Sequence, residues 1–181
     1  MDTLASLRYC KENGQTIAAV VNVPESSIAR EAHAVLPTLA GPELGVASTK
    51  AFTRQLTVPA CMAIAAGRER WGLSAADEQE LVLSLIQLPR LITDVLRREK
   101  EFDVLGHALS TAPLVLYLGR GSTFPLAMEG ALTLKEISYL HAEGFAASEL
   151  KHGPIALIDE TVPIIAMAPS NILYDKMVSN M

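Results

Sequence analysis

Ionisable side chains are concentrated in one stretch of the sequence, residues 135–154, within a chain otherwise rich in alanine and leucine. The stretch ends in a Gly-Pro turn and holds Lys135, Glu136, His141, Glu143, Glu149, Lys151 and His152. A helix buried in a core has little use for so many ionisable groups. Polar groups gathered at a helix end and in the loop after it indicate a functional site.

Glu136 is the first candidate for chemistry, as a carboxylate base near the end of a helix predicted over residues 124–141. Glu129 lies seven residues earlier, so the two carboxylates share a helix face, about 10 Å apart along the axis. Moving a proton between adjacent carbon atoms needs a base that is held rigidly and tuned by partial burial. The alternative is a solvated helix face on which Glu136 pairs with Lys135.

His152 is the second candidate, because the Gly153-Pro154 turn after it directs the side chain away from the core. The alternative is an exposed histidine without a role. His141 lies at the predicted helix C-terminus, where the helix dipole favours a cationic cap. The sequence contains no HxxH or CxxC spacing, so we expect no metal site.

Two loops that contain glycine lead into predicted helices, residues 45–50 and 119–123. Such loops point backbone N–H groups at an anion, yet neither is a dinucleotide fingerprint or a P-loop. The second loop is equally explained as a tight turn with Ser122 as the helix cap. Ser48 is suited either to capping the helix that follows or to contacting a polar ligand through its hydroxyl.

The elements that must position these residues alternate between helices and short apolar strands. We predict strands at residues 16–23, 34–39, 114–118 and 162–167. Their continuous apolar character suits parallel sheets covered on both faces. Long helices are predicted over residues 48–66, from residue 74 to a break at Pro89, and over residues 90–109. This order predicts the α/β class, with a doubly wound parallel sheet in each half.

Each half looks incomplete, since the first begins on a helix and the second ends on one. Two-stranded parallel sheets are poor folding units, so we expect a piece of a longer chain. The expected parts are residues 1–73, the end of a first domain; residues 74–109, connecting helices; and residues 110–181, the start of a second domain.

Composition narrows the class of protein. The chain has 181 residues, 15 basic and 20 acidic, and no basic cluster that would indicate nucleic-acid binding. No signal peptide is visible, and no apolar run is long enough to span a membrane. Cys10 and Cys61 form no disulfide or metal pattern, so we expect two buried thiols in a cytoplasmic protein.

Two strings then identify a family resemblance, GVASTKAFT at residues 45–53 and LKEISYLHAEGFAASELKHGPIALID at residues 134–159. Both resemble the isomerase half of the glutamine–fructose-6-phosphate aminotransferases, which consists of two flavodoxin-like sugar isomerase (SIS) domains. The resemblance covers essentially the whole chain. The second string is long and is not shared in full by generic SIS proteins.

The resemblance implies roles for particular residues. Glu136 matches the glutamate that moves a proton between C1 and C2 of the sugar. His152 matches the histidine that opens the sugar ring and that the neighbouring subunit of a dimer supplies. Val46 and Ser48 match the loop that lines the sugar site. The implied reaction, the first step of hexosamine biosynthesis, converts fructose 6-phosphate and glutamine-derived ammonia to glucosamine 6-phosphate without a cofactor.

The chain also departs from the family pattern. The glutaminase domain, the phosphate-binding loop expected before Asp2 and the C-terminal lysine of the family are missing from it. Thr133 stands where the family has lysine, and Pro59 where it has an aliphatic residue. The resemblance therefore implies a region truncated at both ends. We expect it to be inactive alone, because phosphate anchoring supplies much of the orientation for isomerisation.

Two other functions stay open for such a chain. One is a SIS sugar-phosphate deaminase or deglycase that never had a glutaminase domain. The other is a non-catalytic SIS regulator that binds a sugar phosphate. The combination of Glu136 and His152 argues against the regulator, because binding alone needs no proton shuttle.

Overall fold

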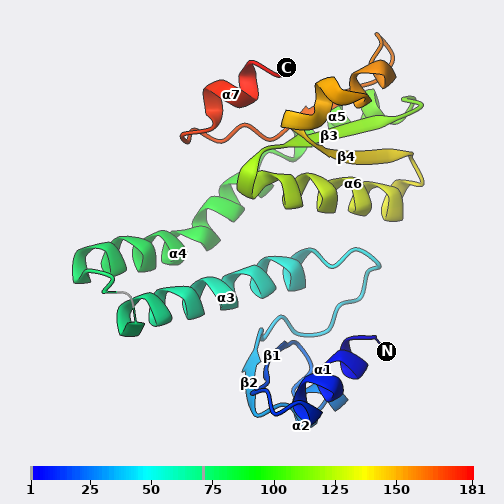
Figure 1. The fold of residues 1–181 in the computed structure, drawn as a ribbon. Helices are drawn as coiled ribbons and strands as arrows, with labels where there is room; N and C mark the ends of the chain where they lie inside the picture. The colour runs from blue at the N-terminus through cyan, green and yellow to red at the C-terminus, as the bar shows by residue number, and fades with distance from the viewer. Residues whose placement is uncertain (1, 71) are drawn as a thin grey trace. The chain divides into compact units, whose positions relative to one another are not determined.

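The structure is a computed structural model that describes residues 2–70 and 72–181 (Figure 1). The chain divides into two compact units, Met1–Asp94 and Val95–Met181. This division falls inside the expected connecting segment, residues 74–109. The expected domain limits stay a prediction, and Met1 and Trp71 lie outside the described residues.

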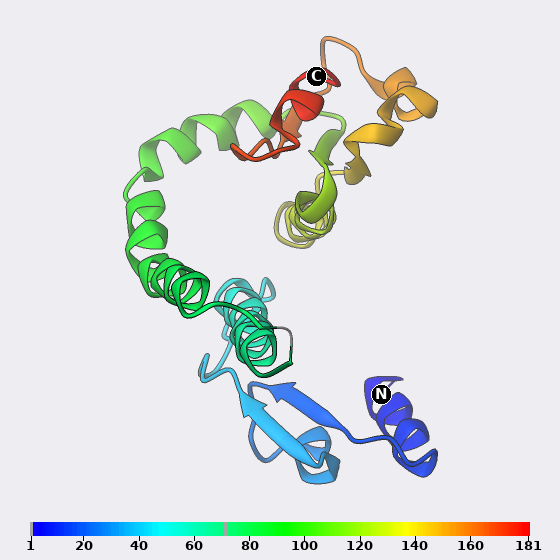
Figure 2. The ribbon, with the colours of Figure 1, turned by 60° about the vertical axis from the view of Figure 1, so that its left-hand side comes forward.

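The first unit contains a small parallel sheet. Its strands β1 (Ala18–Val21) and β2 (Ala34–Pro37) lie side by side and run in the same direction (Figure 2). The helix α1 (Asp2–Glu12) precedes β1, and α2 (Ser27–Glu31) connects the two strands. The hydroxyl of Ser26 caps α2 by accepting the Ala29 N–H at 3.2 Å.

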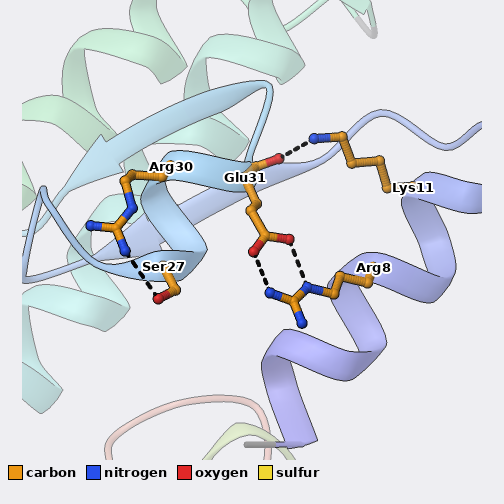
Figure 3. Close-up of polar contacts among 5 residues, drawn as sticks. All are labelled: Arg8, Lys11, Ser27, Arg30 and Glu31. Carbon is orange, nitrogen blue, oxygen red and sulfur yellow. Dashed lines mark hydrogen bonds and ion pairs between the residues drawn. The ribbon is translucent and has the colours of Figure 1, made fainter.

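An ion pair joins α1 to α2. The Arg8 guanidinium donates to both carboxylate oxygens of Glu31, from Nε at 2.9 Å and from Nη2 at 2.6 Å (Figure 3). Lys11 Nζ donates to the Glu31 carbonyl oxygen at 2.8 Å. The hydrogen bond from Arg8 lowers the pKa of the Glu31 carboxyl below its ordinary value. Two parallel bonds fix the relative orientation of the helices as well as attracting them.

Two long helices follow, α3 (Thr49–Arg70) and α4 (Ala75–Leu96). Ser74 begins α4 by accepting the Asp77 N–H at 3.1 Å, as a cap should. The predicted break at Pro89 is wrong, because α4 continues through this proline to Leu96. A proline removes one backbone hydrogen bond, which favourable residues on both sides can outweigh. The predicted helix over residues 90–109 is correspondingly wrong in its start, because residues 90–96 belong to α4, whereas its predicted end at Leu109 is confirmed.

The second unit begins with the end of α4 and the helix α5 (Glu99–Leu109). Its sheet has the strand order β4-β3-β5, and all neighbours are parallel. The strands are β3 (Val115–Gly119), β4 (Ala142–Ala146) and β5 (Ile164–Ala166). The α/β class with parallel sheets is thereby confirmed.

The connections of this sheet lie on opposite faces, as a doubly wound order requires. They are α6 (Phe124–Ser138) from β3 to β4, and η2 (Ala147–His152) with η3 (Pro154–Leu157) from β4 to β5. The final helix α7 (Tyr174–Val178) follows β5. Figure 1 shows β3 and β4 lying between α6 and α7.

The core shows the same division between the two faces. Val115 of β3 packs with Ala131 of α6, whereas Leu118 packs with Leu150 of η2 and Met177 of α7. Successive strand residues point to opposite faces, so these contacts put α6 on one face and η2 with α7 on the other.

The predicted helix over residues 124–141 is too long, and the strand β4 begins directly after its predicted end. The helix α6 ends at Ser138, and Tyr139 after it adopts the left-handed conformation with φ 60°. A Cβ on Gly144 of β4 would lie 2.8 Å from the Met128 Cα, so this glycine lets α6 pack closely on the strand. The second sheet therefore has three strands rather than the two expected.

The ion pair between Arg8 and Glu31 predicts a dependence of stability on pH. A carboxyl whose folded pKa is lowered contributes stability above its ordinary pKa, 4.5, and loses it as pH falls through the folded value. We expect Arg8→Ala to lower the urea midpoint at pH 7 and to have progressively less effect as the pH is lowered below 4.5. An effect of equal size at pH 7 and pH 3 would contradict this account.

Candidate functional site

The loop that carries Val46 and Ser48 follows β2, and Asn22 follows β1 beside it. Asn22 Oδ1 accepts the Ala40 N–H at 2.9 Å and the Thr38 hydroxyl at 3.0 Å. Asn22 Nδ2 donates to the Gly41 carbonyl at 2.7 Å. One amide side chain thus fixes the start of the loop at the carboxyl ends of two parallel strands, where α/β folds place ligands.

Arg54 of α3 holds the same segment through its backbone carbonyls. It donates to the Leu39 carbonyl and, at 3.4 Å, to the Thr38 carbonyl. Leu39 adopts φ 54°, which is unfavourable for a residue with a Cβ. Its neighbours Thr38 and Ala40 are both buried, so the surroundings impose this conformation on the backbone.

The second part of the loop is tied to the first turn of α3. Lys50 Nζ donates to the Pro42 carbonyl at 2.7 Å, and Glu43 Oε1 accepts the Ala51 N–H at 2.8 Å. Between these anchors, Val46 has 81% of its surface exposed. The Ser48 hydroxyl is also exposed and makes no hydrogen bond within the described residues. The structure therefore leaves the Ser48 hydroxyl available to a ligand.

Sequence reasoning missed the anchoring residues Asn22, Glu43 and Arg54. Asn22 had a usable signal, since it is a polar residue near the end of an otherwise apolar predicted strand. Glu43 and Arg54 had none, because their partners lie eight and fifteen or sixteen residues away along the chain.

Glu136 lies in the last turns of α6 and is exposed. The buried residues Ala127 and Ala131 mark the face of α6 that packs on the sheet. At 3.6 residues per turn, Glu136 lies about 140° around the helix from Ala131, so it points away from the sheet. The sequence analysis expects this carboxylate to be partly buried. Among the described residues it is exposed.

His152 is the last residue of η2 and is exposed. Because η2 and α6 cover opposite faces of the sheet, Glu136 and His152 lie on opposite sides of the second unit. Between them the chain runs the length of the edge strand β4, from its amino end to its carboxyl end. A single copy of the unit therefore does not bring the carboxylate and the imidazole together.

His141 does not have the predicted position. It lies three residues beyond the end of α6, so the prediction that it caps this helix is wrong. Its Nε2 lies 3.2 Å from Glu143 Oε1 at the start of β4. The helix ends earlier because Tyr139 takes the left-handed conformation that commonly terminates helices.

The glycine-containing turn at residues 119–123 is held by a hydrogen bond within the turn, and the Leu173 side chain packs beside it. The Thr123 hydroxyl accepts the Arg120 N–H at 2.9 Å. Thr123 has the N-cap position of α6, so the predicted capping by Ser122 is wrong. A Cβ on Gly121 would lie 2.7 Å from Leu173 Cδ1, which shows how closely that side chain fills the space beside the turn.

Residues 2–70 and 72–181 show neither a metal-binding cluster nor a membrane-spanning helix. No group of three or more His, Cys, Asp or Glu residues there is arranged to hold a metal ion. None of the helices in the same residues is long and apolar enough to cross a membrane. Both cysteines are free; Cys61 is exposed and Cys10 half-buried, so the expectation of two buried thiols is wrong.

Comparison with protein families and curated proteins gives one consistent result. The SIS domain profile matches residues 1–65 and 108–178. A glutamine–fructose-6-phosphate aminotransferase (isomerizing) from Brucella melitensis is 65% identical over 180 residues, which is 99% of this chain and 30% of that protein. The corresponding protein of Bradyrhizobium diazoefficiens is 61% identical over the same shares. This chain thus spans about 30% of the length of these relatives.

Solved structures agree with this result. The C-terminal domain of a glucosamine-fructose-6-phosphate aminotransferase from Francisella tularensis superposes with a TM-score of 0.96 and 41% identity. That match covers 99% of this chain and 50% of the solved one.

The three hydrogen bonds of Asn22 predict a stability effect. We expect Asn22→Ala to lower the free energy of unfolding by about 1–3 kcal/mol, because buried Thr38 and the Ala40 amide lose their acceptor. Asn13→Ala is the matched control, since Asn13 makes one exposed bond to the Tyr9 carbonyl. Urea unfolding measures both variants, and equal small losses would contradict the anchoring role.

Proposed function

This chain belongs to the SIS domain family, and from that premise we propose that it is the sugar-isomerising part of a glutamine–fructose-6-phosphate aminotransferase. The observation that carries the proposal is the 65% identity to the Brucella melitensis relative. The match covers 99% of the chain, so it includes the loop with Val46 and Ser48 and the stretch from residue 135 to 154.

The proposed reaction converts fructose 6-phosphate and ammonia from glutamine to glucosamine 6-phosphate, the first step of hexosamine biosynthesis. Glu136 moves the proton between C1 and C2 of the sugar, a role that its place near the end of the helix α6 supports. His152 opens the sugar ring. Val46 and Ser48 contact the sugar, and their exposure on an anchored loop supports this role. No cofactor takes part in the proposed chemistry.

A homodimer is part of the proposal. Glu136 and His152 lie on opposite faces of the second unit, so each copy can present the two groups to different sites. In the proposed dimer, His152 of each subunit completes the site that contains Glu136 of the other. Closed two-fold assemblies are the commonest oligomers, and their symmetry makes both sites equivalent.

A deaminase, a deglycase and a sugar-phosphate-binding regulator are not favoured by any contact among the described residues. Both curated relatives reported above carry the aminotransferase name. Neither nucleic acid nor a membrane belongs to the proposed partners. The proposed location is the cytoplasm, where free thiols such as Cys10 and Cys61 persist.

The role of Glu136 is testable in a chimeric enzyme, in which this chain replaces the matching segment of the Brucella melitensis relative. We expect the chimera to form glucosamine 6-phosphate, and Glu136→Gln to reduce that rate by roughly a hundredfold or more, because a general base is lost. Glutamine hydrolysis should be spared, since its chemistry is separate from the sugar site.

Glu160→Gln is the matched control, because Glu160 is an exposed carboxylate of the same unit. It should leave both rates unchanged. Undiminished product formation by Glu136→Gln would refute the assignment of the base. Failure of the unsubstituted chimera, beside an active relative, would refute the proposed function itself.

The exchange of His152 between subunits predicts complementation in mixed dimers. Glu136→Gln and His152→Asn chimeras, each inactive alone, should form mixed dimers with about half of the wild-type activity, since one of two equivalent sites is intact. Differently tagged subunits allow the mixed dimer to be purified and assayed. If both groups came from one chain, every site of the mixed dimer would be defective and activity would stay absent.

A further inference from the structure

The first turn of α3 uses an unexpected capping group. Ser48 has the N-cap position, and its carbonyl accepts the Phe52 N–H at 3.1 Å. Serine is among the best N-cap residues, because its hydroxyl ordinarily accepts an N–H of the first turn. Here the Ala51 N–H is instead taken by Glu43 Oε1 at 2.8 Å.

The carboxylate of Glu43 is well suited to replace the serine hydroxyl. A negative charge at a helix N-terminus is favoured by the helix dipole, and a hydrogen bond to a charged acceptor is stronger than one to a hydroxyl. The bond from Lys50 Nζ to the Pro42 carbonyl holds the chain next to Glu43 against the same helix turn. Glu43 is half-buried, whereas Ser48 is exposed.

We propose that Glu43 is a positioning residue, which caps α3 in place of Ser48 and so keeps the Ser48 hydroxyl free to bind a sugar hydroxyl. The choice of ligand rests on the function proposed above. A carboxylate at this helix N-terminus also repels a phosphate group.

The proposal predicts a specific change in substrate affinity. In the chimeric enzyme, Glu43→Ala lets the Ser48 hydroxyl turn to the Ala51 N–H, which withdraws it from the sugar. We expect KM for fructose 6-phosphate to rise roughly three- to tenfold, the value of one hydrogen bond, with a smaller change in kcat. Glu43→Gln keeps an acceptor oxygen and should restore most of the affinity. Glu25→Ala, which removes an exposed carboxylate of the same unit, should change neither constant.

A double-mutant cycle separates positioning from general loss of structure. If Glu43 acts through Ser48, then Glu43→Ala should have no further effect on KM once Ser48→Ala is present. Additive effects of the two substitutions would overturn the proposal. So would a failure of Glu43→Gln to recover affinity.

Amide hydrogen exchange at Ala51 in the 181-residue chain tests the cap without any sugar. Ser48→Ala should leave the exchange rate unchanged, whereas the double substitution with Glu43→Ala should raise it roughly twofold to thirtyfold, the range for losing a cap. Faster exchange in Ser48→Ala alone would identify Ser48 as the cap and overturn the proposal. An inactive unsubstituted chimera would instead refute the proposed function, and the exchange result would still decide the role of Glu43.

Discussion

The parallel pairing of β3 with β4 and β5 is the constraint on which the second unit depends. A parallel sheet must be covered on both faces, and here α6 covers one face while η2 and α7 cover the other. Gly144 permits the close approach of α6 that this packing needs. The same arrangement separates Glu136 from His152, and the proposed exchange of groups between subunits rests on this separation.

In the first unit, polar contacts fix the loop that follows β2. Asn22 and Arg54 hold a backbone segment that includes the unfavourable conformation of Leu39, and Glu43 joins the end of that loop to α3. An exposed loop without such bonds would sample many conformations. Anchoring both ends leaves Val46 and Ser48 exposed on a fixed backbone, which is the condition for a loop to bind a small ligand without a large ordering cost.

The sequence predicted those elements that are specified by neighbouring residues, such as an apolar run or a helix cap. The strand at residues 114–118 is a continuous apolar run, and Ser74 is a recognisable helix cap; both are present within a residue of the predicted position. The strand β4 was missed because its sequence, AEGFA, has little intrinsic strand preference and pairs only because β3 lies beside it. Pro89 led to a wrong prediction for the opposite reason. Proline usually ends a helix, but here the helical residues on both sides outweigh that local preference.

The sequence by itself determined the fold class and the family, because apolar periodicity and two long motifs are properties of neighbouring residues. It also singled out Glu136, His152, Val46 and Ser48 as candidates by type and position. Only the tertiary structure decided that Glu136 and His152 face opposite sides of a sheet, and that Glu43 rather than Ser48 caps α3. Both relations depend on strand pairing and loop closure, which spacing along the chain does not encode.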